Sequence, residues 1–78
     1  MTTKLQEQML NKIALNLNTI INGNEPSCYE DTLVDKNHVI SSPMDQAVLT
    51  SLLRAKLIVE KDDTIQLTKN GFLIFEDL

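Results

Sequence analysis

The chain has few of the residues that build disulfides, metal centres and phosphate-binding loops. Its 78 residues include one Cys, one His and two Gly. A lone Cys cannot form an internal disulfide, and one Cys with one His cannot supply the ligand set of a structural zinc site. Gly23 and Gly71 lie far apart, so they do not form a glycine-rich phosphate loop. We therefore expect no metal and no cofactor.

Residues for covalent or acid–base catalysis are equally scarce. Cys28 and His38 could act as nucleophile and base, but no third group and no oxyanion cradle accompany them in the sequence. If Cys28 begins a helix, its position would favour a redox sensor. A small Cys that faces the core is the more ordinary role. The sequence therefore predicts that the protein is not an enzyme.

The chain also lacks a membrane span and a secretory signal. No apolar run approaches the roughly 18 residues that cross a bilayer, and no basic stretch precedes an apolar one at the N-terminus. With 42% hydrophobic and 23% charged residues, the composition is that of a small globular domain. Together with the lone Cys, these features predict one domain, residues 1–78, in the cytoplasm.

Basic residues are outnumbered. Seven Lys and Arg stand against 11 Asp and Glu, and the net charge is −4. Modules that bind nucleic acid usually concentrate Lys and Arg, because phosphate neutralisation supplies much of their affinity. The total charge therefore counts against tight DNA binding, although charge on one face matters more than the total.

Apolar residues at helical spacing predict an amphipathic helix from Thr3 to Ile21, ended by Asn22–Gly23. Its predicted buried stripe consists of Leu5, Met9, Ile13, Leu17, Ile20 and Ile21, widened by Leu10 and Ala14. Ser27 and Glu30 have the spacing of a capping box.

That spacing predicts a short helix over about Cys28–Asp35, with Leu33 and Val34 facing inward. The polar break 36–38 follows, and Val39–Ile40 is either a short strand or a buried connection.

The second half of the chain carries the clearest pattern. A helix is predicted over Pro43–Leu57, with Ser42 as N-cap and a buried face of Val48, Leu49, Leu52, Leu53 and Leu57. Ile58–Lys61 and Thr64–Leu67 predict a hairpin around Asp62–Asp63. Thr68 is expected to cap a last helix, in which Phe72, Phe75 and Leu78 face the core and Leu73 or Ile74 faces partly outward.

The segment LTSLLRAKLIVEKDDTIQLTKNGF resembles the recognition helix and wing of winged-helix proteins. The pattern LxxLxxxxLI, an IxLT return strand and a following Gly occur here in the order usual for that superfamily. The resemblance implies an α+β, mainly α fold: a long N-terminal helix, a short helix, a recognition-type helix, a two-stranded wing and a C-terminal helix. The chain is similar to small winged-helix proteins of bacteria and phages. It departs from the pattern in a long break over 36–42 and in a first strand that is hard to locate.

The resemblance implies a DNA-binding regulator of transcription. The exposed side of the third helix would carry Gln46, Ala47, Thr50, Ser51 and Arg54. Of these, Gln46, Thr50, Ser51 and Arg54 would meet the DNA, and Lys56 and Lys61 would meet phosphates.

A protein-binding module is the alternative, because the turn 60–63 is net negative and like charge repels phosphate. A basic partner, such as a host protein met by a phage factor, would then bind an acidic surface of Glu30, Asp31, Asp35, Glu60, Asp62 and Asp63. DNA binding gains if Arg54, Lys56, Lys61 and Lys69 share a face free of carboxylates. Protein binding gains if Asp45, Glu60, Asp62 and Asp63 interrupt that face.

The two terminal helices have more apolar residues than one face of a helix needs. The run 72–75 is apolar all round, and Leu10 and Leu15 add to the first helix. Either the two helices absorb this excess by packing on each other, or it forms an interface. We expect a homodimer through the N- and C-terminal helices.

Overall fold

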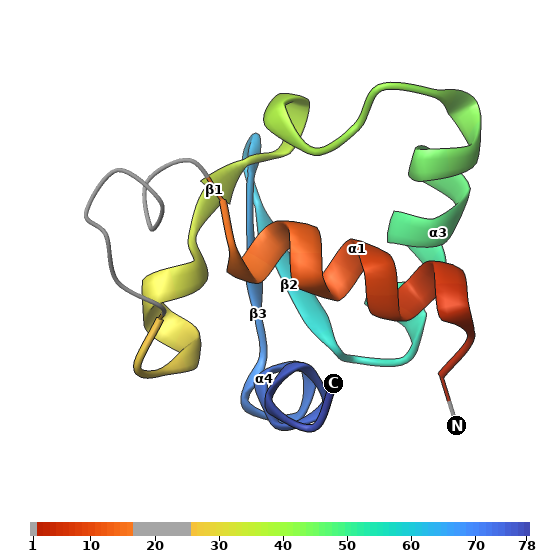
Figure 1. Cartoon of the computed structure of the whole chain (residues 1–78). Coiled ribbons are helices and arrows are strands. Elements are labelled where there is room, and N and C mark those ends of the chain that lie inside the picture. The colour runs from red at the N-terminus through yellow and green to blue at the C-terminus, as the bar shows by residue number, and fades with distance from the viewer. Residues whose placement is uncertain (1, 17–25) are drawn as a thin grey trace.

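The computed structural model describes residues 2–16 and 26–78 (Figure 1). These residues form an α+β fold with three α-helices, a three-stranded antiparallel sheet and two short 3₁₀ turns. The helices are α1 (Lys4–Ala14), α3 (Pro43–Arg54) and α4 (Lys69–Glu76). The strands are β1 (Val34–Asp35), β2 (Ile58–Lys61) and β3 (Thr64–Leu67). The 3₁₀ turns are η1 (Tyr29–Thr32) and η2 (Lys36–His38). The predicted fold class is confirmed at this level.

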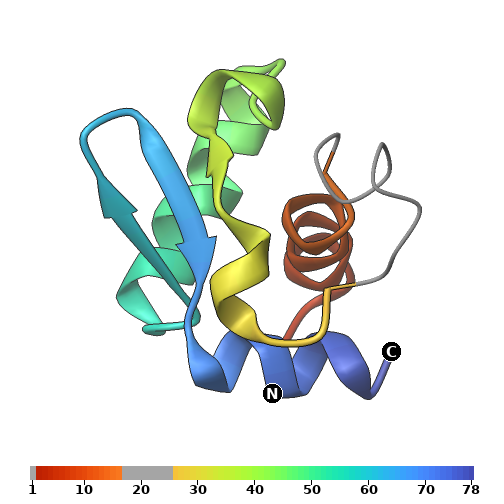
Figure 2. The same cartoon turned by 90° about the vertical axis from the view of Figure 1, so that its left-hand side faces the viewer.

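The sheet has the order β1-β3-β2, so β3 is its central strand (Figure 2). The hairpin β2–β3 has the predicted bounds, with Lys61 opposite Thr64 across a two-residue turn. Asp62 takes a φ of 56° in this turn. Aspartate tolerates this left-handed conformation better than most residues, and short hairpin turns require it.

Strand β1 replaces the last two residues of the predicted helix Cys28–Asp35. Val34 pairs with Ile65 and Asp35 with Thr64, and only the four residues of η1 are helical. Val34 is buried, as predicted, but Leu33 is 49% exposed because side chains alternate between the two faces of an extended segment. The prediction that Leu33 faces inward was therefore wrong.

The predicted capping box at Ser27 and Glu30 was also wrong. The backbone N–H and the hydroxyl of Ser27 donate instead to Asp31 Oδ2, at 3.0 and 2.9 Å. The carboxylate that stabilises this turn is thus one residue further along the chain than the capping-box pattern requires.

Helix α1 begins with a capping box that joins Thr3 and Gln6. It ends at Ala14, because Leu15 leaves the helical region with φ −100° and ψ 55°. The buried side chain of Asn16 donates to the carbonyls of Ile13 and Thr32, which anchors the end of the helix to η1. The rest of the predicted helix and its stop signal at Asn22–Gly23 lie outside the described residues.

The core lies between α1, the inner face of the sheet, α3 and α4 (Figures 1 and 2). Its fully buried side chains include Leu10, Ile13, Leu49, Leu52, Ile65 and Leu67. Leu5, which was predicted to be buried, is 49% exposed. The buried stripe of α1 therefore runs through Leu10 and not through Leu5.

Helix α3 begins as predicted, with the Ser42 hydroxyl accepting from the N–H of Asp45 at 3.2 Å. It ends at Arg54, three residues before the predicted Leu57, because Lys56 turns the backbone with a φ of 61°. Leu57 stays buried in the connection to β2. Val39 is buried without being part of a strand, so the alternative of a buried connection is the correct one.

Helix α4 has the predicted cap, in which the Thr68 hydroxyl accepts from the N–H of Gly71. A Cβ on Gly71 would lie 2.0 Å from the carbonyl oxygen of Leu57, so only glycine allows this close approach. Phe72 is buried as predicted, but Leu78 is 57% exposed because the helix ends at Glu76.

Candidate nucleic-acid interface

The outer face of α3 carries most of the residues predicted to meet DNA. Residues 43, 47, 50 and 54 follow helical spacing along this face; Ala47 and Arg54 are exposed and Thr50 is half-buried. Gln46 is exposed beside them, and its carbonyl accepts from the Thr50 hydroxyl at 3.0 Å. From Gln46 to Arg54 the helix has no carboxylate.

Ser51 does not belong to this outer face. Its hydroxyl donates to the carbonyl of Val48 at 2.6 Å and accepts from Gln6 Nε2 of α1 at 3.1 Å. Both bonds turn the side chain towards α1. Ser51 therefore helps to join α1 to α3, and it is not beside Gln46, Thr50 and Arg54.

Three cations gather where α3, the hairpin and α4 meet. The Thr68 hydroxyl donates to the Lys56 carbonyl at 2.8 Å, which brings the start of α4 against the turn after Arg54. Arg54, Lys56 and Lys69 are all exposed there, and we call these three residues the basic end. Lys69 was not among the predicted DNA contacts, because its place beside Arg54 and Lys56 depends on how α4 docks.

The other end of the hairpin is acidic. Asp62 and Asp63 form the turn, and β1 adds Asp35 opposite Thr64. With Glu60, these residues form what we call the acidic tip. Lys61 lies at this end and is therefore separated from the basic end by the length of the hairpin. Arg54, Lys56, Lys61 and Lys69 thus do not share one face free of carboxylates, and this observation favours the protein-binding alternative.

Lys36 is held within the acidic tip. Its Nζ lies 2.8 Å from Glu60 Oε2, and its backbone N–H donates to the carbonyl of Asp63 at 2.7 Å. The hydrogen bond and charge of Glu60, followed by the charges of Asp63 and Asp35, raise the pKa of Lys36. This is the one ion pair within the described residues, so the cations of the basic end are not in ion pairs there.

The six residues of the predicted acidic surface do not form one patch. Asp35, Glu60, Asp62 and Asp63 share the acidic tip, but Glu30 and Asp31 lie in η1. Thr32, which ends η1, accepts from the N–H of Leu67 at the opposite end of β3. Glu30 and Asp31 are therefore separated from the tip by the length of the strand.

The start of α3 lies at the same end of the molecule as the acidic tip (Figures 1 and 2). Asp45 is in the first turn of α3 and accepts from the N–H and hydroxyl of Ser41 at 2.8 and 2.9 Å. These two hydrogen bonds lower the pKa of its carboxyl. Carboxylates thus outnumber the cations at this end of α3 and the hairpin, and the three cations of the basic end lie at the other.

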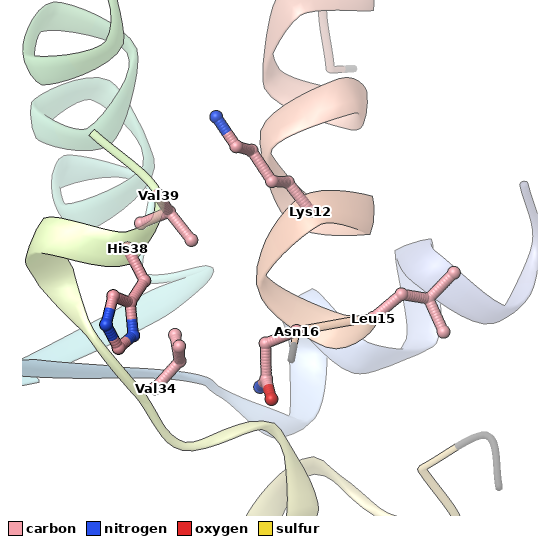
Figure 3. Close-up of a pocket in the computed structure, with 6 residues that line it drawn as sticks. All are labelled: Lys12, Leu15, Asn16, Val34, His38 and Val39. Atoms are coloured by element: carbon pink, nitrogen blue, oxygen red, sulfur yellow. The ribbon is translucent and has the colours of Figure 1, made fainter. Parts of the chain in front are cut away.

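A pocket of about 270 Å³ lies between the end of α1, β1 and η2 (Figure 3). It is lined by Lys12, Leu15, Asn16, Val34, His38 and Val39. The Lys12 side chain extends towards α3, and its charge contributes to the low pKa of Asp45. The pocket wall is mainly apolar, and its polar groups include the Asn16 amide and the His38 ring.

Cys28 and His38 lie in different turns, on either side of β1 in the sequence. In residues 2–16 and 26–78, no group of three or more His, Cys, Asp and Glu could hold a metal ion. No helix in those residues is long and apolar enough to cross a membrane.

Comparisons with known proteins assign no family. No family model matches the chain, and neither the curated proteins nor the solved structures contain a significant match to it.

Proposed function

We propose that this protein is a small winged-helix regulator that acts in the cytoplasm as a homodimer and binds duplex DNA through the outer face of α3. The order of helices and strands, the hairpin and the Thr68 cap support the winged-helix assignment. Strand β1, which pairs with β3, would correspond to the short first strand of the family pattern.

The observation that carries this proposal is the uncovered polar face of α3. Gln46 and Thr50 can reach base edges in a major groove, and Arg54 can reach bases or phosphates. The face has no carboxylate from Gln46 onward and leads directly into the basic end. Local charge therefore favours phosphate at this position, although the whole chain is acidic.

The acidic tip favours a second candidate, binding of a basic protein. Asp35, Glu60, Asp62 and Asp63 lie together at one end of the sheet, with Lys36 and Lys61 as the cations among them. A basic partner would be attracted to this end, as in a phage-type factor that modulates a host protein.

A titration with labelled random duplex DNA at about 50 and 200 mM salt tests the first candidate. We expect affinity to fall steeply with salt, because bound Lys and Arg release counterions from phosphates. Arg54→Ala should weaken binding, whereas the matched variant Lys61→Ala, which removes a cation from the acidic tip, should not.

Flat titration curves at low salt would contradict DNA binding. The protein would then be used as bait in a pull-down, with Asp62→Asn and Asp63→Asn together as the control. A partner retained by the unaltered acidic tip and lost from this variant would support the second candidate.

A further inference from the structure

The turn that ends α3 contains a lysine where glycine is the usual residue. The N–H of Lys56 donates to the carbonyl of Leu53 at 3.1 Å, and the N–H of Leu57 donates to that of Leu52 at 3.0 Å. These bonds define a Schellman motif, whose left-handed residue is Lys56 with a φ of 61°. A lysine side chain destabilises this conformation because its Cβ crowds the following carbonyl oxygen.

The rest of the motif does not require lysine. Leu52 and Leu57 are both buried, which provides the apolar contact that usually accompanies the turn. Glycine would form the same hydrogen bonds without the crowding. A strained residue that its neighbours hold in place is a reason to look for function.

The position of Lys56 indicates what the side chain contributes. The Thr68 hydroxyl holds the Lys56 carbonyl, and the Thr68 N–H donates to the carbonyl of Leu57 at 3.0 Å. Lys56 is thereby fixed between Arg54 and Lys69. The three cations are exposed and, among the described residues, outside any ion pair.

The acidic tip lies too far away to neutralise this cluster. Strand β2 separates the two ends of the hairpin by four residues, which corresponds to roughly 13 Å of extended chain. Exposed charges that are further apart than the Debye length, about 8 Å in physiological salt, are largely screened from each other.

We propose that Arg54, Lys56 and Lys69 hold the phosphodiester backbone of the bound DNA, and that the acidic tip of the hairpin stays out of contact with it. This inference rests on the proposed function and adds the orientation in which the protein binds the DNA. Lys56 keeps its strained turn because the side chain binds phosphate. Phosphate is the ligand that a cluster of exposed, unpaired cations beside a polar helix face fits best.

The variant Lys56→Gly tests this directly, because it separates binding from folding. We expect its melting temperature to rise, since glycine relieves the crowding at a positive φ. We also expect its affinity for random duplex DNA to fall by roughly fivefold to tenfold at 0.1 M salt, with a salt slope smaller by about 0.9. A protein that folds more stably cannot lose binding through unfolding.

Matched variants test which end of the hairpin contacts the phosphates. Lys69→Gln should reduce the salt slope by a similar amount, whereas Lys61→Gln and the pair Asp62→Asn with Asp63→Asn should leave it unchanged. Lys56→Arg should retain the slope, because it keeps the charge in the same turn.

Two different failures can be told apart. Wild-type protein that binds no duplex would overturn the proposed function and this inference with it. Wild-type binding that Arg54→Ala weakens but Lys56→Gly and Lys69→Gln leave unchanged would overturn this inference alone. A rise in affinity on neutralising Asp62 and Asp63 would show that the tip approaches DNA, which would also contradict it.

Discussion

The side chain of Thr32 extends the hydrogen bonding of the sheet beyond the end of a strand. Its hydroxyl donates to the carbonyl of Tyr29 at 2.6 Å and accepts from the N–H of Leu67 at 2.9 Å. The residue is fully buried, so without this oxygen the Leu67 donor would be left without a partner. One hydroxyl thus connects η1 to the last residue of β3.

We predict that Thr32→Val lowers the free energy of unfolding by about 1 to 3 kcal/mol, the cost of leaving a buried donor unpaired. Valine has nearly the same shape, so packing should change little. Urea denaturation followed by circular dichroism measures the effect. Thr32→Ser keeps the hydroxyl and should be closer to wild type; equal midpoints for Thr32→Val and wild type would contradict the role.

Thr32 could not have been recognised from the sequence. Its partner Leu67 is 35 residues away, and nothing near Thr32 indicates that a strand will pass there. The caps at Ser42 and Thr68 were predictable because the side chain and the backbone N–H that it accepts from are three residues apart. At the scale of single residues, local hydrogen bonds can be predicted and distant ones cannot.

The same distinction holds for whole elements. The bounds of the hairpin β2–β3 were predicted correctly, because two runs with β-branched residues lie on either side of a two-residue turn. Strand β1 has only two residues and exists because β3 lies beside it, so the local pattern predicted a helix there instead. The ends of α1 and α3 were placed too late for a related reason, since Asn16 and Lys56 stop the two helices through contacts and backbone conformation.

The stability of the fold at the start of α3 and at η1 should depend on pH. Hydrogen bonds from Ser41 lower the pKa of Asp45 in the folded protein, and hydrogen bonds from Ser27 lower that of Asp31. A carboxyl with a lowered folded-state pKa stabilises the fold fully above its unfolded pKa, near 3.9 for aspartate. That contribution is lost as the pH falls through the lower, folded-state value.

We therefore predict that Asp45→Asn reduces the loss of melting temperature between about pH 5 and pH 2, because asparagine has no proton to gain. Thermal melts across this range provide the measurement. Ser41→Ala removes the hydroxyl donor but keeps the backbone donor, so its pH dependence should lie between those of wild type and Asp45→Asn. An unchanged pH profile for Asp45→Asn would show that this carboxylate does not stabilise the start of α3.

At the scale of the whole molecule, the arrangement of charge is more informative than its sum. The polar face of α3 could be predicted from helical spacing, and residues 46, 50 and 54 do lie on the outside. The grouping of Lys69 with Arg54 and Lys56 could not be predicted, because it depends on the docking of α4 through Thr68. Ser51 and Lys61 were assigned to the same surface by residue type, and both lie elsewhere.

The proposed homodimer would use the region between the ends of α1 and α4. A hollow of about 310 Å³ there is lined by Asn11, Leu15, Pro26, Phe75, Glu76 and Leu78. We predict that Leu78→Glu converts the dimer to a monomer, because it places a charge in that interface. Sedimentation velocity measures the change.

The matched control for this experiment is Leu33→Glu. Leu33 is 49% exposed, compared with 57% for Leu78, but it lies between η1 and β1 and does not line the hollow. This variant should remain dimeric. A wild-type protein that sediments as a monomer at micromolar concentration would contradict the homodimer.

The central place of β3 also bears on the order in which the chain assembles. Its pairing with β2 closes a turn of two residues, whereas its pairing with β1 closes the whole stretch between Asp35 and Thr64. The entropy lost on closing a loop grows with its length, so the hairpin is expected to form first and β1 to join a strand that already exists. Helix α1 contacts α3, β3 and α4, and can complete its packing only after these elements have met. Folding would then proceed from the C-terminal half of the chain towards the N-terminal half, with α1 closing over the core as the last step.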